Sequence, residues 1–120
     1  MKYRGKSHAK IFETEVAKHK DASNIFIGCL YLLTADTRVW SGMKHRVQNN
    51  SFIFSDVHLG DVSPDAYALF MTAKDIYNDE KHLFASDMTD KTLLSDKLFE
   101  IITCGIGICR NGLERNGEIC

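Results

Sequence analysis

The sequence lacks an apolar run long enough to cross a membrane. Its longest run, Ile25 to Leu33, reaches about half of the roughly 20 residues that a bilayer span requires. The N-terminus also lacks the apolar stretch of a signal peptide, because the positively charged Lys2 and Arg4 are followed by His8 and Lys10. We therefore expect no membrane association and a cytoplasmic location in the cell that makes the chain.

The signature motifs of common enzyme classes are missing as well. There is no Gly-rich phosphate loop, nucleophile elbow, HExxH pair or EF-hand loop. Among the four cysteines, Cys29 lies in an apolar run, where burial raises the pKa of a thiol and makes it a poor nucleophile. In a chain that is not secreted, cysteines are more often free thiols or metal ligands than a disulfide framework. These absences favour a protein that is not an enzyme.

What the sequence does contain is the composition of an ordinary folded domain. Of its 120 residues, 44% are apolar and 26% are charged, which is far from the composition of disordered chains. A chain of this length has enough apolar residues for one hydrophobic core and too few for two. Residues 1–120 are therefore expected to form a single domain.

Charge is divided unevenly along the chain, although the formal net charge is only −1. Residues 1–54 carry nine Lys or Arg against four acids, whereas residues 55–100 carry four Lys against ten acids. Such a division can orient a partner. Attraction between the two segments within the fold explains it equally well.

Apolar residues recur at three-to-four spacing in several segments, which is the pattern of amphipathic helices. The clearest start is Ser63-Pro64-Asp65, where a capping residue precedes a proline and an acid in the first turn. Ser7 is the expected cap of the first helix. The expected helices cover residues 7–20, 23–35, 36–47, 63–78 and 91–103.

The fold class that follows is mainly α: a single compact helical domain of about five helices. A short extended segment near residues 51–57 follows the break at Asn49-Asn50, because its aromatic and β-branched residues favour a strand or an extended loop. Gly105 and Gly107 are expected to end or loosen the last helix. Residues 111–117 have the composition of a mobile tail.

Histidines and cysteines offer a candidate metal site. Cys104 and Cys109 flank Gly105 and Gly107, which would let the backbone fold around an ion, and His8 could join them from another segment. Zinc binds four nitrogen or sulfur ligands, which proteins commonly supply as close pairs. We therefore predict a zinc site at His8, Cys104 and Cys109. The alternative is that Cys29 and Cys104 are small buried apolar residues and that the histidines lie at the surface.

A second hypothesis concerns Arg38 and His45. Their spacing fits the loose Arg-x4-6-His pattern of a large group of helical ribonucleases, in which arginine holds the phosphate and histidine acts as acid or base. Gly42 interrupts the helix that would carry this pair. A structural explanation is simpler, with Asp36 capping the third helix and Arg38 pairing with an acid on a neighbouring helix.

Several pieces of the sequence occur together in a characteristic order. They are Tyr3-x4-His8-x3-Phe12, then Cys29-Leu30-Tyr31-Leu32-Leu33 leading to Asp36-Thr37-Arg38, then Ala68-Leu69-Phe70 to Tyr77-Asn78, and finally Leu98-Phe99. In these pieces, which span most of the chain, the sequence resembles an uncharacterised family of small proteins from phages and mobile elements of Gram-positive bacteria. The chain has Ser55-Asp56-Val57-His58 where that family has a tryptophan-containing segment.

The resemblance implies an anti-defence function. Small phage and mobile-element proteins without enzyme motifs often bind a host defence protein, and some are anti-CRISPR proteins that inhibit Cas9. Such a protein would bind Cas9 stoichiometrically and block nucleic-acid loading or cleavage, with no sequence-specific nucleic-acid binding of its own. A structural zinc-binding interaction module is the third possibility. The acids expected to steer the chain onto a basic channel of its partner are Asp75, Asp79, Glu80 and Asp87.

Overall fold

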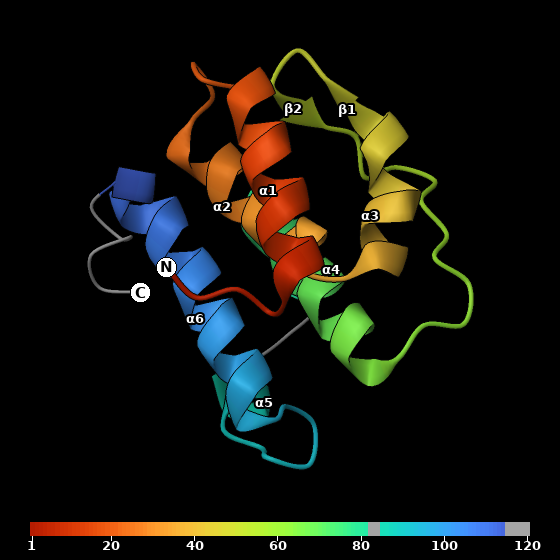
Figure 1. The fold of residues 1–120 in the computed structure, drawn as a ribbon. Coiled ribbons are helices and arrows are strands. Elements are labelled where there is room, and N and C mark those ends of the chain that lie inside the picture. The colour runs from red at the N-terminus through yellow and green to blue at the C-terminus, as the bar shows by residue number, and fades with distance from the viewer. Residues whose placement is uncertain (82–84, 115–120) are drawn as a thin grey trace.

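The most apolar segment of the sequence forms the central helix of the molecule, α2 (Asn24–Thr34). Figure 1 presents the computed structural model, which describes residues 1–81 and 85–114, with the other long helices arranged around α2. The helices that contact α2 are α1 (Lys6–Lys18), α3 (Thr37–Met43), α4 (Pro64–Asn78) and α6 (Asp96–Asn111). Because neighbours enclose α2, every residue from Phe26 to Thr34 is buried.

Short elements complete the fold. They are the 3-10 turn η1 (Lys44–Arg46), the strands β1 (Val47–Gln48) and β2 (Ser51–Phe52), and the helix α5 (Ala85–Met88). The described residues thus form a mainly helical globule with a two-stranded sheet, which confirms the expected fold class. None of the helices described combines the length and the apolar character that a bilayer crossing requires.

Side-chain caps explain where most of the long helices begin. Ser23, Ser63 and Ser95 each accept a hydrogen bond from the backbone N–H three residues later, which satisfies a donor that the first helical turn leaves unpaired. The start predicted at Ser63-Pro64 is confirmed. The cap predicted at Ser7 is wrong, because the N–H of Ala9 already donates to Gly5 and the helix begins at Lys6.

The segment after α3 differs from the prediction. The third helix ends at Met43 and not near residue 47, because the chain turns through η1 into a β-hairpin. Asn49 and Asn50 have φ angles of 52° and 57°, the left-handed values that a tight two-residue hairpin turn needs. The predicted extended segment therefore has a partner strand, and Phe52 stacks on Phe26 with ring centroids 4.4 Å apart.

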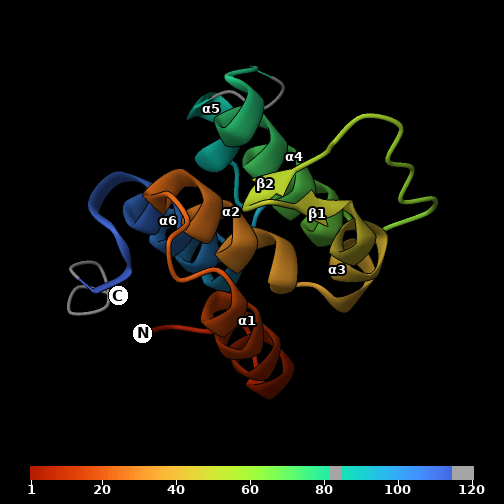
Figure 2. The ribbon, with the colours of Figure 1, turned by 90° about the horizontal axis from the view of Figure 1, so that it is seen from above.

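A long loop leads from the hairpin to α4 and stands away from the helices in Figure 2. Arginine side chains hold it at both ends. Arg46 donates to the carbonyl oxygens of Ser55 and Asp56, at 3.3 and 3.5 Å, and Arg38 donates to that of Asp61 at 2.9 Å. The loop is thereby tied back to η1 and α3.

The last helix is displaced from its predicted position. It begins at Asp96, because the Asp90 carboxylate accepts hydrogen bonds from the N–H and hydroxyl of Thr92 and holds a turn before it. It continues to Asn111, so the prediction that it ends at Gly105 or Gly107 is wrong. The predicted connection over residues 79–90 also contains α5. Of the predicted tail, residues 115–117 lie outside the described residues.

Candidate functional site

Residues of the N-terminal segment gather against Tyr31 of α2 in one group, here called the N-terminal cluster: Tyr3, Arg4, His8, Phe12 and Tyr31. The side chains of His8, Phe12 and Tyr31 are buried, and those of Tyr3 and Arg4 are half-buried. The ring of His8, 2% exposed, packs against Tyr31 with centroids 4.7 Å apart and meets Tyr3 edge-on at 5.2 Å. Phe12 meets Tyr31 edge-on at 5.4 Å, and the Tyr31 hydroxyl donates to the carbonyl oxygen of Lys2. The cluster therefore fastens the chain before α1 to the central helix.

Both ring nitrogens of His8 are used inside this cluster. Nδ1 accepts a hydrogen bond from the backbone N–H of Arg4 at 2.9 Å, so Nε2 carries the proton and donates to the carbonyl oxygen of Tyr31 at 2.8 Å. Burial, with the positive charge of Arg4 as a smaller cause, lowers the pKa of His8 to about 4. In this arrangement His8 is a neutral structural side chain with neither nitrogen open to a ligand.

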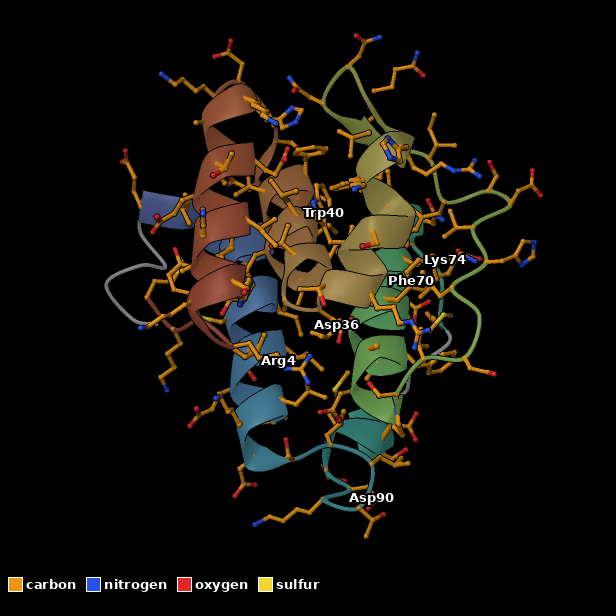
Figure 3. All side chains as sticks on the ribbon, turned by 45° about the vertical axis from the view of Figure 1, so that its right-hand side comes forward. Arg4, Asp36, Trp40, Phe70, Lys74 and Asp90 are labelled. Atoms are coloured by element: carbon orange, nitrogen blue, oxygen red, sulfur yellow. The ribbon has the colours of Figure 1, made fainter. Side chains whose placement is uncertain are left out.

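Arg4 also connects the starts of two further helices. Its guanidinium donates to the carboxylates of Asp36, at 3.2 Å, and Asp65, at 3.1 Å, and Figure 3 shows Arg4 beside Asp36. Asp36 caps α3 through the N–H groups of Arg38 and Val39, as predicted. Arg38 was expected to pair with an acid on a neighbouring helix, but its guanidinium donates to the carbonyl oxygen of Asp61 in the loop. The arginine that pairs with acids of neighbouring helices is Arg4. Arg4 thus ties the N-terminal segment to the starts of α3 and α4.

The predicted zinc ligands do not meet in the described part of the chain. Cys104 and Cys109 both lie on the continuous helix α6, and five helical residues separate side chains by about 140° around the axis. His8 is occupied as described above. Residues 1–81 and 85–114 contain no group of three or more His, Cys, Asp or Glu side chains placed to hold a metal ion. The zinc site stays a prediction.

Arg38 and His45 do not share a helix, because α3 ends at Met43 and His45 lies in η1. His45 is exposed, and the Arg38 guanidinium is bonded to the carbonyl oxygen of Asp61. The single helix face that the ribonuclease pattern requires is therefore missing from this arrangement.

The predicted partner-binding acids fall into two places. Asp79 and Glu80 are exposed just beyond the C-terminal end of α4, and Asp75 is half-buried in its last turn. Asp87 lies on α5 and lines a hollow against the first turns of α4, at the opposite end of a helix about 21 Å long. The four residues do not form one patch.

Two apolar hollows flank Tyr67 on the outer side of α4 and are here together called the α4 groove. The first, about 250 Å³, lies between α4 and the segment from α5 to α6. It is lined by Pro64, Tyr67, Ala68, Asp87, Met88, Leu93 and Leu94. The second, about 360 Å³, lies under the long loop and is lined by Val57, His58, Leu59, Gly60, Val62, Tyr67, Phe70 and Met71. Nearly all of these side chains are apolar.

Local sequence pattern does not reveal this groove, because it does not show which side chains of the helix over residues 63–78 stay uncovered. In the structure Tyr67 is 52% exposed and Leu93 is 49% exposed, whereas their neighbours Ala68 and Leu94 are buried. Phe70 and Met71, which follow Tyr67 on the same helix face, are buried, so helical periodicity alone would place Tyr67 in the core as well. The helix α5, which supplies Asp87 and Met88 to the first hollow, was also not predicted.

Comparison of the chain with protein-family models, with curated proteins and with solved structures finds no match.

Proposed function

We propose that this chain is a protein-binding module that docks through the α4 groove, and that its partner is a bacterial defence nuclease of the Cas9 type. The proposal combines two sources. The docking surface is inferred from the exposed apolar hollows around Tyr67, and the partner class is inferred from the family resemblance. In this proposal the chain acts in the bacterial cytoplasm by occupying a site on its partner, and it performs no chemistry.

The observation that carries the proposal is the exposed tyrosine between two apolar hollows. Tyrosine is among the residues that most often dominate binding energy at protein interfaces, because it combines a large apolar ring with a polar end. Leu93 adds an exposed apolar side chain at the rim of the first hollow. A partner side chain inserted on either side of Tyr67 would cover apolar surface that water now contacts.

Charge around the groove supports a basic partner. Asp61 and Asp90 are exposed in the loops beside the two hollows, and Asp87 lines the first one. A negative border of this kind speeds association with a positively charged surface such as a nucleic-acid channel.

The test measures cleavage of target DNA by purified Cas9 while this chain is titrated in. Inhibition is expected to saturate near one equivalent, and the complex should be detected at a 1:1 ratio by native mass spectrometry. Tyr67→Ala is expected to weaken binding at least about tenfold, which is the loss typical of an interface hot spot. Ile25→Ala is the matched control, because Ile25 is also exposed, at 40%, but lies on α2 away from the groove.

The two parts of the proposal fail separately. Full cleavage of the target DNA by Cas9 at a tenfold excess of the chain would rule out Cas9 as the partner. Equal inhibition by the wild-type chain and by Tyr67→Ala would rule out the α4 groove as the docking surface, because binding would then use another surface.

A further inference from the structure

Two cysteines from distant parts of the chain meet at the interface of α2 and α6. Cys29 on α2 is 0% exposed, Cys109 on α6 is half-buried, and both are free thiols. The Cys29 sulfur lies 3.5 Å from the carbonyl oxygen of Ala73 on α4, and the Cys109 sulfur lies 3.7 Å from that of Ile25 on α2. The pair therefore has one member inside the core and one near the surface.

Glycines allow the two helices to approach closely here. A Cβ atom at Gly28 would lie 2.1 Å from the sulfur of Cys109 and 2.8 Å from the carbonyl oxygen of Gly105. A Cβ atom at Gly105 would lie 2.5 Å from a methyl carbon of Leu32. The backbones of α2 and α6 are thus in contact, and Cys109 rests directly on α2 next to Cys29. A disulfide needs this kind of close backbone approach.

The two thiols differ in character. The proximity of Cys29 lowers the pKa of Cys109, whereas the proximity of Cys109, followed by burial, raises the pKa of Cys29 well above its usual value. The thiolate, and not the thiol, is the nucleophilic form of cysteine. Cys109 is therefore both the more accessible and the more nucleophilic member of the pair, and Cys29 is the proton-bearing partner behind it.

We propose that Cys29 and Cys109 form a redox-active pair that reacts with hydroperoxides and closes to a disulfide between α2 and α6. This inference is independent of the α4 groove and of any partner. It assigns the pair a modification chemistry in which Cys109 is oxidised first and Cys29 then displaces the oxygen to form the disulfide.

The chemistry balances with one hydroperoxide. The Cys109 thiolate attacks the terminal peroxide oxygen, the O–O bond breaks, the alkoxide or hydroxide takes up a proton, and Cys109 becomes a sulfenic acid. The Cys29 thiol then gives up its proton, its sulfur attacks the sulfur of Cys109, and the S–O bond breaks to release water. Two thiols are oxidised by two electrons, and the peroxide is reduced to an alcohol or water plus a second water.

The test treats the full-length chain, in which Cys29 and Cys109 are free thiols, with hydrogen peroxide near one equivalent. The remaining thiols are blocked with iodoacetamide, and non-reduced peptides are mapped by mass spectrometry. The expected product is a peptide pair joined between Cys29 and Cys109, which is absent in Cys109→Ser. In Cys29→Ala the resolving thiol is missing, so dimedone labelling of Cys109 should rise about tenfold over wild type.

A second measurement needs no variant. The rate at which Cys109 reacts with iodoacetamide in the wild-type chain is followed against pH, and its midpoint is expected below the usual value of about 8.5 for a cysteine. Failure to form the Cys29–Cys109 link, together with a Cys109 midpoint at or above that value, would overturn the proposal. A link that joins Cys109 only to another cysteine would overturn it as well.

Discussion

The N-terminal cluster and the α4 groove treat their aromatic residues in opposite ways. In the cluster, the rings of His8, Phe12 and Tyr31 are buried against one another, and the polar atoms of His8 are hydrogen bonded. In the groove, Tyr67 is half exposed between two unfilled apolar hollows. The cluster has little contact area left to offer a partner, whereas the groove has apolar surface that folding alone does not cover.

This contrast separates residues that a fold needs from residues that a partner could use. Substitutions in the two regions should therefore have opposite consequences: loss of stability from the cluster and loss of binding from the groove.

The largest effect is expected from His8→Ala. The change leaves the carbonyl oxygen of Tyr31 and the N–H of Arg4 without their partner and opens a cavity among aromatic rings. The free energy of unfolding should fall by about 3 kcal/mol, the combined cost of a lost buried hydrogen-bond pair and of the removed ring. This loss is measured by urea unfolding, with circular dichroism as the signal. His58→Ala is the control, because His58 is exposed, and a comparable loss there would contradict the structural role assigned to His8.

The pH dependence of stability sharpens the same point. The folded-state pKa of His8 is about 4, below the usual 6.5, so the unfolded chain binds a proton more readily between these values. The contribution of His8 is complete above pH 6.5 and is lost as the pH falls toward 4, by about 2 kcal/mol at pH 4.5. Urea unfolding at pH 7 and pH 4.5 should show this fall in wild type and a smaller one in His8→Gln, which cannot titrate. Identical falls in both proteins would contradict it.

Asp36→Ala is expected to cost somewhat less. It removes the cap of α3 and one of the two carboxylates that Arg4 bridges, but the ion pair is partly exposed to solvent. A loss of about 1.5 kcal/mol in the free energy of unfolding follows, mostly from the cap. Asp61→Ala is the matched control, since its side chain is exposed and only its backbone oxygen is used. Thermal unfolding compares the two variants, and equal transitions would contradict the capping role.

The smallest effect on stability is expected from Tyr67→Ala, the variant with the largest expected effect on binding. Because half of its surface is already exposed, truncation should change the free energy of unfolding by no more than about 1 kcal/mol. Urea unfolding compares the free energy of unfolding of this variant with that of Ala68→Gly, because the side chain of Ala68 is buried in the same helix. A loss near that of His8→Ala would show that Tyr67 belongs to the core and would erase the contrast between the two regions.

Local sequence signals located much of the fold. Ser63-Pro64 marked the start of α4 correctly, and the apolar run of α2 identified the central helix, because caps and apolar periodicity act within a few residues. The two glycines of α6 were misread. Gly105 does not break the helix, since its missing side chain allows contact with Leu32, a reason that lies in another part of the chain.

The candidate site was less predictable than the fold. The acidic character of residues 55–100 was visible in the sequence, but the α4 groove depends on how α5 and the long loop lie against Tyr67. Likewise, His8 was chosen as a metal ligand for its chemistry, and only its contacts with Arg4 and Tyr31 reveal its structural use.

By itself, then, the sequence determined which segments become helices, where most of them begin, and that α2 must be enclosed, because these depend on short-range hydrogen bonds and on apolar content. The tertiary structure alone decided that Arg4 bridges Asp36 and Asp65, that Cys109 packs against Gly28 beside Cys29, and that Tyr67 remains uncovered. The physical reason is that each of these depends on distances between residues far apart in the chain, which helix packing sets and local pattern does not.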